Sequence, residues 1–276
     1  MTQICFNASE IATLINKNPY KTQEDGIYDV LCRITKTKNT KDLDKFDIIN
    51  KDELEKLLNL FNKEQLINKE TYEKLEKELK EEKNIKNISK KLFKNISKES
   101  INTKCTNESK IKQKKIEEKL DNIVKKNTTE VKQYVNGFIN KQRGVKNENK
   151  IIEKYENRNN TKITNNNSCL YKIKIFDIEN NSIYICGKID GIENNELIEV
   201  KNRRNRLFTF IPEYEKIQTE IYFRLTNLTK GKLIQNYNDT QSTFEININN
   251  DLWSSILEDL YKVSQIIISQ LTTFTK

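Results

Sequence analysis

Residues 187–191 (Gly-Lys-Ile-Asp-Gly) and residues 199–201 (Glu-Val-Lys) are the stretch that decides the fold of this chain. An aspartate closes one short apolar run, and a glutamate and a lysine stand two positions apart on the next. Because successive side chains of a strand point to opposite faces, Glu199 and Lys201 share one face while Val200 points into the core. The pattern predicts a small β-hairpin that gathers two carboxylates and an ammonium at one edge.

The apolar surroundings of Glu199 separate it from the other charged positions of the chain. Charged residues make up 32% of the sequence, and several other Glu-x-Lys pairs lie in polar stretches that we interpret as solvated helix. Glu199 instead stands among Leu197, Ile198 and Val200, which are typical of a buried strand. A carboxylate buried there is costly unless a cation or a hydrogen-bonding partner compensates it. The context favours a metal site over a surface ion pair.

Carboxylate and carbonyl oxygens are the ligands that Mg²⁺ and Mn²⁺ prefer in proteins. Asp190 and Glu199 are therefore the predicted metal ligands, with the backbone carbonyl of Val200 as a third donor. Lys201 is expected to orient an attacking water and to offset charge on a scissile phosphate, whether or not it accepts the proton itself. This combination suits metal-assisted hydrolysis of a phosphodiester.

Two further polar residues are predicted to lie on helices beside this edge. Glu148 belongs to an amphipathic helix with Ile152 and could bind the metal directly or through water; the alternative is a solvated surface charge. Gln218 falls on a helix predicted to begin at Pro212. It could hydrogen-bond the attacking water or Lys201, or it could be a surface amide.

The basic residues of the chain favour a polyanionic partner. The formal net charge is +9 over 276 residues. Arginine is scarce, yet Arg203, Arg204 and Arg206 lie close together just after the predicted metal site. We interpret this cluster as a clamp on a sugar-phosphate backbone, which contributes affinity without reading sequence. The alternative is a solvated loop.

Several classes of protein are excluded or disfavoured by composition. Histidine is absent, which excludes histidine-based catalysis and histidine-ligated zinc. The five cysteines include no Cys-x-x-Cys pair and are typical of reduced thiols. Neither a signal peptide nor an apolar run long enough to span a membrane is visible. We therefore predict an intracellular protein, cytoplasmic or nuclear, that is neither secreted nor bound to a membrane.

The chain divides into three predicted parts. Residues 1–38 show two short helices, the first capped by Asn7 or Ser9. Residues 39–135 are rich in lysine and glutamate with almost no glycine or proline, which predicts a helical insert. Residues 136–276 hold the compact core, an α/β arrangement in which helices cover a sheet. Its predicted elements are a helix around 148–155, a three-strand meander (171–175, 183–190 and the strand of Glu199), a helix at 212–224, strands at 233–237 and 244–248, and a closing helix.

Three blocks of the sequence resemble one known family when taken in order. They run from Phe6 to Lys21, from Arg143 through Glu148 to Glu156, and from Gly187 to Gln218. Together they are similar to the PD-(D/E)xK nuclease superfamily, and more narrowly to the phage lambda exonuclease or YqaJ type of viral recombinase. The insert has no counterpart in the likeness. The family usually has a second helix glutamine where this chain has Glu220, and its lambda-type members carry an arginine ahead of the position of Ser9, where this chain has none.

The resemblance implies a fold and an activity. The fold is a restriction-endonuclease-like α/β core, a mixed central sheet flanked by helices, to which residues 1–38 and 136–276 both contribute. Glu148, Asp190, Glu199, Lys201 and Gln218 would be its catalytic residues, and Ser9 and Arg143 would join the arginine cluster in contacting DNA. The implied activity is that of a Mg²⁺- or Mn²⁺-dependent deoxyribonuclease acting on duplex ends, in viral recombination, replication or repair.

The same resemblance leaves some points open. Lambda-type relatives form ring trimers, and a single-strand annealing protein is a conceivable partner. A structure-specific or nicking endonuclease with the same site is an alternative. So is a catalytically silent module that binds nucleic acid.

Overall fold

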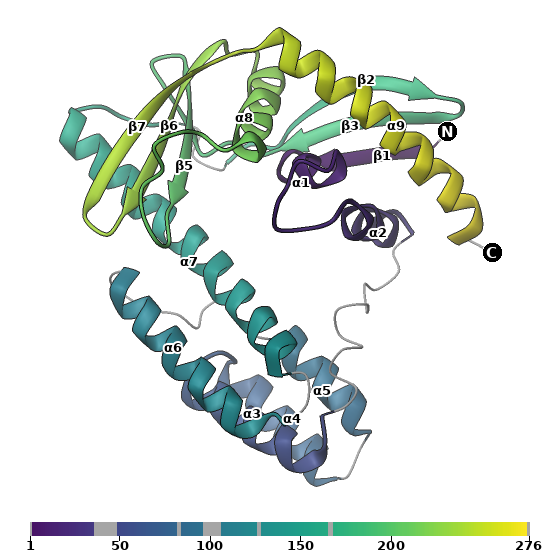
Figure 1. Ribbon diagram of the computed structural model, residues 1–276, viewed down its shortest axis with the longest axis vertical. Coiled ribbons are helices and arrows are strands. Elements are labelled where there is room, and N and C mark those ends of the chain that lie inside the picture. Colours follow the sequence, from purple (N-terminus) through teal and green to yellow (C-terminus); the bar gives the residue numbers. More distant parts are fainter. Residues whose placement is uncertain are drawn as a thin grey trace. The chain divides into compact units, whose positions relative to one another are not determined.

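The computed structural model describes residues 2–35, 49–81, 84–95, 106–125, 128–164 and 168–274 (Figure 1). The chain forms two compact units. The first, here called the core unit, combines Met1–Lys38 with Glu148–Lys276, and the second, the helical unit, spans Asn39–Asn147. The predicted boundary at 38/39 lies outside the described residues, and the predicted start of the core at 136 falls inside a long helix, α7 (Thr128–Asn159).

The strands of the core unit form two mixed sheets. The first has the order β1 (Thr2–Asn7), β3 (Asn181–Gly187) and β2 (Tyr171–Ile178), with β1 parallel and β2 antiparallel to β3. The second sheet has four strands, in which β5 and β6 pair in parallel and the outer pairs are antiparallel. Its strands, in order, are β4 (Gly191–Glu193), β5 (Glu196–Asn202), β6 (Lys230–Tyr237) and β7 (Thr240–Asn247).

The hairpin of β4 and β5 sets the register of the predicted site. Its two turn residues, Asn194 and Asn195, have φ angles of 47° and 66°. Asparagine tolerates this left-handed backbone, which the tightest hairpin turns require. Gly191 pairs with Ile198 across the hairpin, so the next position along places Asp190 opposite Glu199. A Cβ at Gly191 would lie 2.2 Å from Cγ2 of Ile163, so glycine is required directly after the aspartate.

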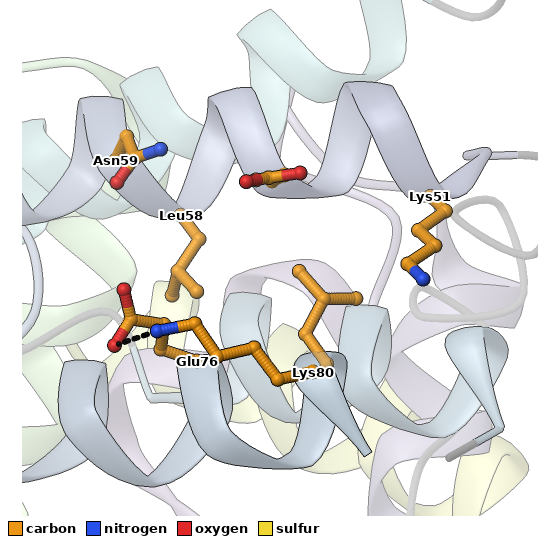
Figure 2. A pocket seen from close by; sticks show the side chains of 7 residues that line it. Lys51, Leu58, Asn59, Glu76 and Lys80 are labelled. Atoms are coloured by element: carbon orange, nitrogen blue, oxygen red, sulfur yellow. Dashed lines mark ion pairs between the residues drawn. The ribbon is translucent and has the colours of Figure 1, made fainter. Parts of the chain in front are cut away.

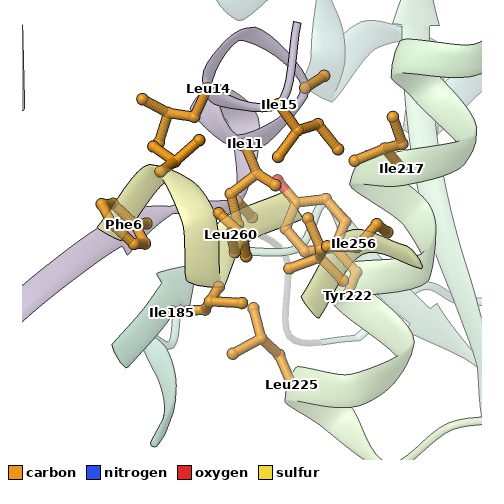
Figure 3. Close-up of a cluster of buried hydrophobic side chains, with 14 of the residues drawn as sticks. Phe6, Ile11, Leu14, Ile15, Ile185, Ile217, Tyr222, Leu225, Ile256 and Leu260 are labelled. Atoms are coloured by element: carbon orange, nitrogen blue, oxygen red, sulfur yellow. The ribbon is translucent and has the colours of Figure 1, made fainter. Parts of the chain in front are cut away.

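Helices cover both faces of the four-stranded sheet. On one face, Ile217 and Ile221 of α8 (Glu213–Thr226) belong to the same buried cluster as Leu197 of β5. On the other face, Ile152 near the end of α7 clusters with Val200. The main cluster also includes side chains of α1 (Ala8–Leu14), α2 (Gln23–Ile34) and α9 (Asn250–Phe274), and Figure 3 shows part of it. Alternate residues of β5 therefore enter two different cores, with the odd-numbered ones facing α8.

The helical unit has its own buried core. It contains α3 (Lys51–Lys63), α4 (Lys69–Lys80), α5 (Ile85–Lys94), α6 (Thr106–Ile123) and the first part of α7. Asparagine caps three of these helices: Asn50, Asn68 and Asn84 each accept a backbone N–H from three residues further on. The unit's buried side chains include Leu54, Leu57, Phe61, Leu66, Leu75, Leu92, Phe93, Leu120 and Val135.

A cavity of about 300 Å³ opens between α3 and α4 of the helical unit (Figure 2). Its lining mixes lysine and glutamate with leucine, and Lys80 pairs with Glu76 across 3.1 Å. Both signs of charge are present, so the cavity selects neither an anion nor a cation.

The predicted α/β class, with mixed strands flanked by helices, is confirmed. The predicted three-strand meander is wrong, because β3 pairs with β1 and not with β5. The first helix is also preceded by a strand, β1, that the sequence pattern did not predict. β1 supplies a parallel partner from far away in the chain, and no local pattern records such a pairing. Among the described residues, none of the helices combines the length and apolarity that crossing a bilayer requires.

Candidate active site

Asp190 and Glu199 face one another where the β4–β5 hairpin ends. Only 9% of Asp190 and 2% of Glu199 is exposed. Asp190 Oδ2 accepts the backbone N–H of Val200 at 2.7 Å. Glu199 Oε1 accepts a hydrogen bond from Lys201 Nζ at 2.6 Å, whereas Glu199 Oε2 is buried and has no hydrogen-bond partner among the described residues. A buried carboxylate oxygen without a partner is costly.

The electrostatics of the two charged groups differ. Burial raises the pKa of Glu199 to about 8, and the charge of Asp190 adds to the increase. Burial also acts to lower the pKa of Lys201, but the charge and hydrogen bond of Glu199 outweigh it and hold the pKa above its ordinary value. Lys201 is therefore an ammonium at neutral pH.

Lys201 is held by a short chain of hydrogen bonds that runs along α8. Its Nζ donates to Gln218 Oε1 at 2.9 Å, and Gln218 Nε2 in turn donates to the hydroxyl oxygen of Tyr222 at 2.9 Å. Tyr222 is buried, and burial together with the charge of Glu199 raises its pKa. The residue types and the spacing of four on one helix face were visible in the sequence, but only the fold shows that Tyr222 orients Gln218.

Glu148 lies on α7 and is half-buried. Its charge is among those that raise the pKa of Tyr222, so it is within electrostatic reach of this site. Among the described residues, no three Asp, Glu, Cys or His side chains lie close enough together to form a metal site by themselves. The close set of side-chain oxygens is thus Asp190 and Glu199, with Glu148 farther out.

The arrangement nevertheless fits a hard divalent cation. Two carboxylates converge, and one of their oxygens is buried without a partner. In an extended strand, the backbone N–H and C=O groups of one residue point to the same side of the strand. Because the Val200 amide faces Asp190, the Val200 carbonyl also points to the edge where β4 has ended. Two carboxylates and a carbonyl form the oxygen donor set that Mg²⁺ or Mn²⁺ binds, with water completing the coordination.

Arg203 is not placed as the predicted phosphate clamp requires. Only 7% of it is exposed, and its guanidinium forms a two-bond ion pair with buried Glu215, with Nη2 to Oε2 at 2.8 Å. Its Nε also donates to Gln235 Oε1 at 2.9 Å, and its Cζ lies 4.1 Å from the ring centre of Phe208. Buried cations are almost always paired in this way. We correct the prediction: Arg203 is structural, because its donors are engaged inside the protein.

The other predicted DNA contacts are in different positions. Arg204 and Arg206 are exposed on the loop after β5, as a phosphate contact requires. Ser9 is exposed in the first turn of α1, and Asn7 occupies the N-cap position in its place. Arg143 lies on α7, but its side chain is outside the described residues. Glu220 is buried, where it pairs with Arg224 and accepts the backbone N–H of Asn249.

The raised pKa of Glu199 predicts a pH-dependent stability for the protein without metal. Between about pH 4.5 and 8 the folded state retains a proton that the unfolded state has released, so the free energy of unfolding falls as pH rises. The decrease approaches about 1.4 kcal/mol per pH unit. Urea unfolding in EDTA at pH 5, 6, 7 and 8 measures it. Glu199→Gln is expected to remove this part of the slope and the exposed Glu245→Gln to retain it; equal slopes in all three proteins would contradict the burial of Glu199.

Comparison with known proteins identifies distant likenesses among solved structures. No family model matches the chain, and no curated protein matches it either. Among solved structures, the protein described as SSO0001 is 20% identical over 43% of this chain, with a TM-score of 0.35, and the chain spans 56% of its length.

Two further solved structures are of an alkaline exonuclease, LHK-Exo, from Laribacter hongkongensis. One is 14% identical, with a TM-score of 0.39, over 49% of this chain and 71% of that one. The other, a complex with dAMP, is 11% identical, with a TM-score of 0.48, over 98% of this chain and 90% of that one. These identities and TM-scores are too low to carry an argument about activity.

Proposed function

We propose that this chain is a Mg²⁺- or Mn²⁺-dependent deoxyribonuclease that degrades duplex DNA from its ends. One observation carries the proposal: a buried glutamate, Glu199, has one oxygen without a partner, faces Asp190 and is paired through its other oxygen with Lys201. Two acids and an ammonium on one hairpin suit the hydrolysis of a negatively charged phosphodiester. The family resemblance of the sequence supports the same reaction.

Each residue of the site has a role in this proposal. Asp190, Glu199 and the Val200 carbonyl would hold the metal, which when bound would polarise the phosphate and make water more acidic. The Lys201 ammonium offsets charge on the phosphate and orients the attacking water. Gln218 holds Lys201 in place by accepting its hydrogen bond, and Tyr222 fixes Gln218 by accepting another. Glu148, within electrostatic reach, would bind a water on the metal or the metal itself.

Several finer features are supported by the resemblance together with the charge of the chain. The net charge of +9 and the exposed Arg204 and Arg206 support contact with a sugar-phosphate backbone. Four further features rest on the resemblance alone: action from DNA ends, a role in viral recombination, a ring of three subunits and a single-strand annealing partner.

The proposal is tested with linear and covalently closed duplex DNA of the same sequence. Each is incubated with Mg²⁺, with Mn²⁺ and with EDTA, and the products are resolved by electrophoresis. We expect loss of linear DNA only, and only with metal. Cleavage of closed circles would show that the protein is an endonuclease that needs no DNA end. If no DNA or RNA is cleaved with either metal but nucleic acid is still bound, the alternative of a catalytically silent binding module replaces the proposal.

A further inference from the structure

A cavity of about 460 Å³ lies in the core unit. Its walls come from two places in the chain, the turn after α1 and the segment from the loop after β5 into the first turn of α8. The side chains that matter here are those of Tyr20, Arg206, Phe208, Phe210 and Tyr214. We call this the aromatic cavity.

Two rings of the aromatic cavity are unusually exposed. The exposed fraction is 77% for Tyr20 and 68% for Phe210, and both line the cavity. Large apolar groups that gather at a surface hollow commonly mark a binding site. A cation, Arg206, lines the same hollow and is itself exposed.

The wall that carries Phe208 is held by several hydrogen bonds. Gln235 is fully buried; its Oε1 accepts the Phe208 N–H at 2.9 Å and its Nε2 donates to the Phe208 carbonyl at 2.7 Å. The same Oε1 accepts a hydrogen bond from Arg203, whose guanidinium lies over the Phe208 ring. The ion pair of Arg203 with Glu215 connects this wall to α8. Arg203 thus anchors the loop that presents Arg206 and Phe210.

The opposite wall is also held in place. The Asn18 side chain donates to Thr13 Oγ1 at 2.8 Å and accepts the Tyr20 N–H at 3.0 Å. The rings of Tyr20 and Tyr214 meet edge to face, with 5.7 Å between their centres. A surface that is ordered before its ligand arrives loses less conformational entropy on binding.

The aromatic cavity and the candidate active site both use side chains of α8. Tyr214, which lines the cavity, and Gln218, which holds Lys201, are four residues apart on α8. Residues at this spacing share a helix face and are separated along the axis by about 6 Å.

We propose that the aromatic cavity binds an unpaired nucleobase, with Arg206 contacting the phosphate next to it. The assignment of the strand as DNA rests on the proposed function. A nucleotide is the ligand that offers both a flat π-face for Phe210 and Tyr20 and an anion for Arg206. A base within a duplex has both faces covered by its neighbours, so the cavity takes a base at a frayed end or in a single strand. Every base has a π-face, and the cavity is therefore tolerant of sequence.

The test measures binding in EDTA, so that cleavage plays no part. The probes are a single-stranded oligonucleotide of 12 nucleotides that contains 2-aminopurine and a blunt duplex of the same sequence closed by a hairpin. Phe210→Ala and Tyr20→Ala are each expected to weaken single-strand binding about tenfold and to reduce the quenching of 2-aminopurine that stacking causes. Arg206→Ala is expected to lower the slope of log K against log salt by about 0.7. Tyr261→Ala, which removes an exposed tyrosine on α9, is the matched control and should change neither quantity.

The results separate the cavity from the nuclease proposal. Unchanged single-strand affinity and quenching in Phe210→Ala and Tyr20→Ala would overturn the cavity assignment even in an active nuclease. An equal loss of affinity for the blunt duplex would overturn the preference for an unpaired base. If the parent protein shows no metal-dependent cleavage but these variants still weaken single-strand binding, the cavity assignment stands and the nuclease proposal fails.

Discussion

Lys201→Ala is expected to abolish metal-dependent DNA cleavage while leaving DNA binding largely intact. The substitution removes the ammonium that Glu199 and Gln218 hold at the site. Loss of one preorganised charge that stabilises a developing negative charge typically costs about 10²–10³-fold in rate. Single-turnover cleavage of an end-labelled linear duplex measures the rate, and electrophoretic retardation in EDTA measures binding. Asp190→Ala should behave in the same way, since it removes a proposed metal ligand.

The matched control is Lys216→Ala. Lys216 is an exposed lysine on α8, two residues before Gln218, so its removal changes the net charge by the same amount. Its cleavage rate should stay within about twofold of the parent, because an exposed charge contributes little to a fixed local field. Circular dichroism and thermal unfolding show whether Lys201→Ala still folds. A folded Lys201→Ala protein that cleaves at the parent rate would remove Lys201 from the mechanism.

Arg203→Ala is expected to cause the largest loss of stability among single substitutions in the arginine cluster. It leaves Glu215, of which 2% is exposed, as a buried carboxylate without its cation. Breaking a buried ion pair from one side typically costs about 3–5 kcal/mol. The loop that carries Phe208 also loses the cation that lies over its ring. Urea unfolding at pH 7 measures the change in the free energy of unfolding.

Two comparisons show whether the buried pair is the cause. Arg204→Ala, at the exposed neighbouring position, should change the free energy of unfolding by less than about 0.5 kcal/mol. The double variant Arg203→Met/Glu215→Leu should be markedly more stable than Arg203→Ala, because it leaves no charge unpaired. Equal free energies of unfolding for Arg203→Ala and Arg204→Ala would show that Arg203 is a surface cation.

The hairpin shows how much of the site was readable in advance. The Asn-Asn turn, the alternation of Leu197, Glu199 and Lys201 along one strand face, and the glycine after Asp190 are all local patterns. They predict which side chains share an edge because strand periodicity and turn chemistry act over a few residues. The helix that carries Gln218 was equally readable from Pro212, which stands at its N-cap position.

The arginine cluster shows where the same reasoning failed. Arg203, Arg204 and Arg206 look alike in a sequence, and only the pairing partners distinguish them. Glu215 and Gln235, which bury Arg203, lie 12 and 32 residues further along the chain. The parallel pairing of β1 with β3 was missed for the same reason.

The sequence by itself determined the α/β class, the turn that leads into β5 and which side chains share a face of β5, because propensity, periodicity and turn residues are local properties of the chain. The short strand β4, which pairs with β5 in place of the predicted strand 183–190, was decided by the tertiary structure. The tertiary structure decided which carboxylate oxygen is left without a partner, which arginine is consumed by an ion pair, and that two distant segments form an aromatic cavity. Each of these depends on burial and on contacts between residues remote in sequence, and the free energy of a charged or aromatic group is set by what surrounds it after folding.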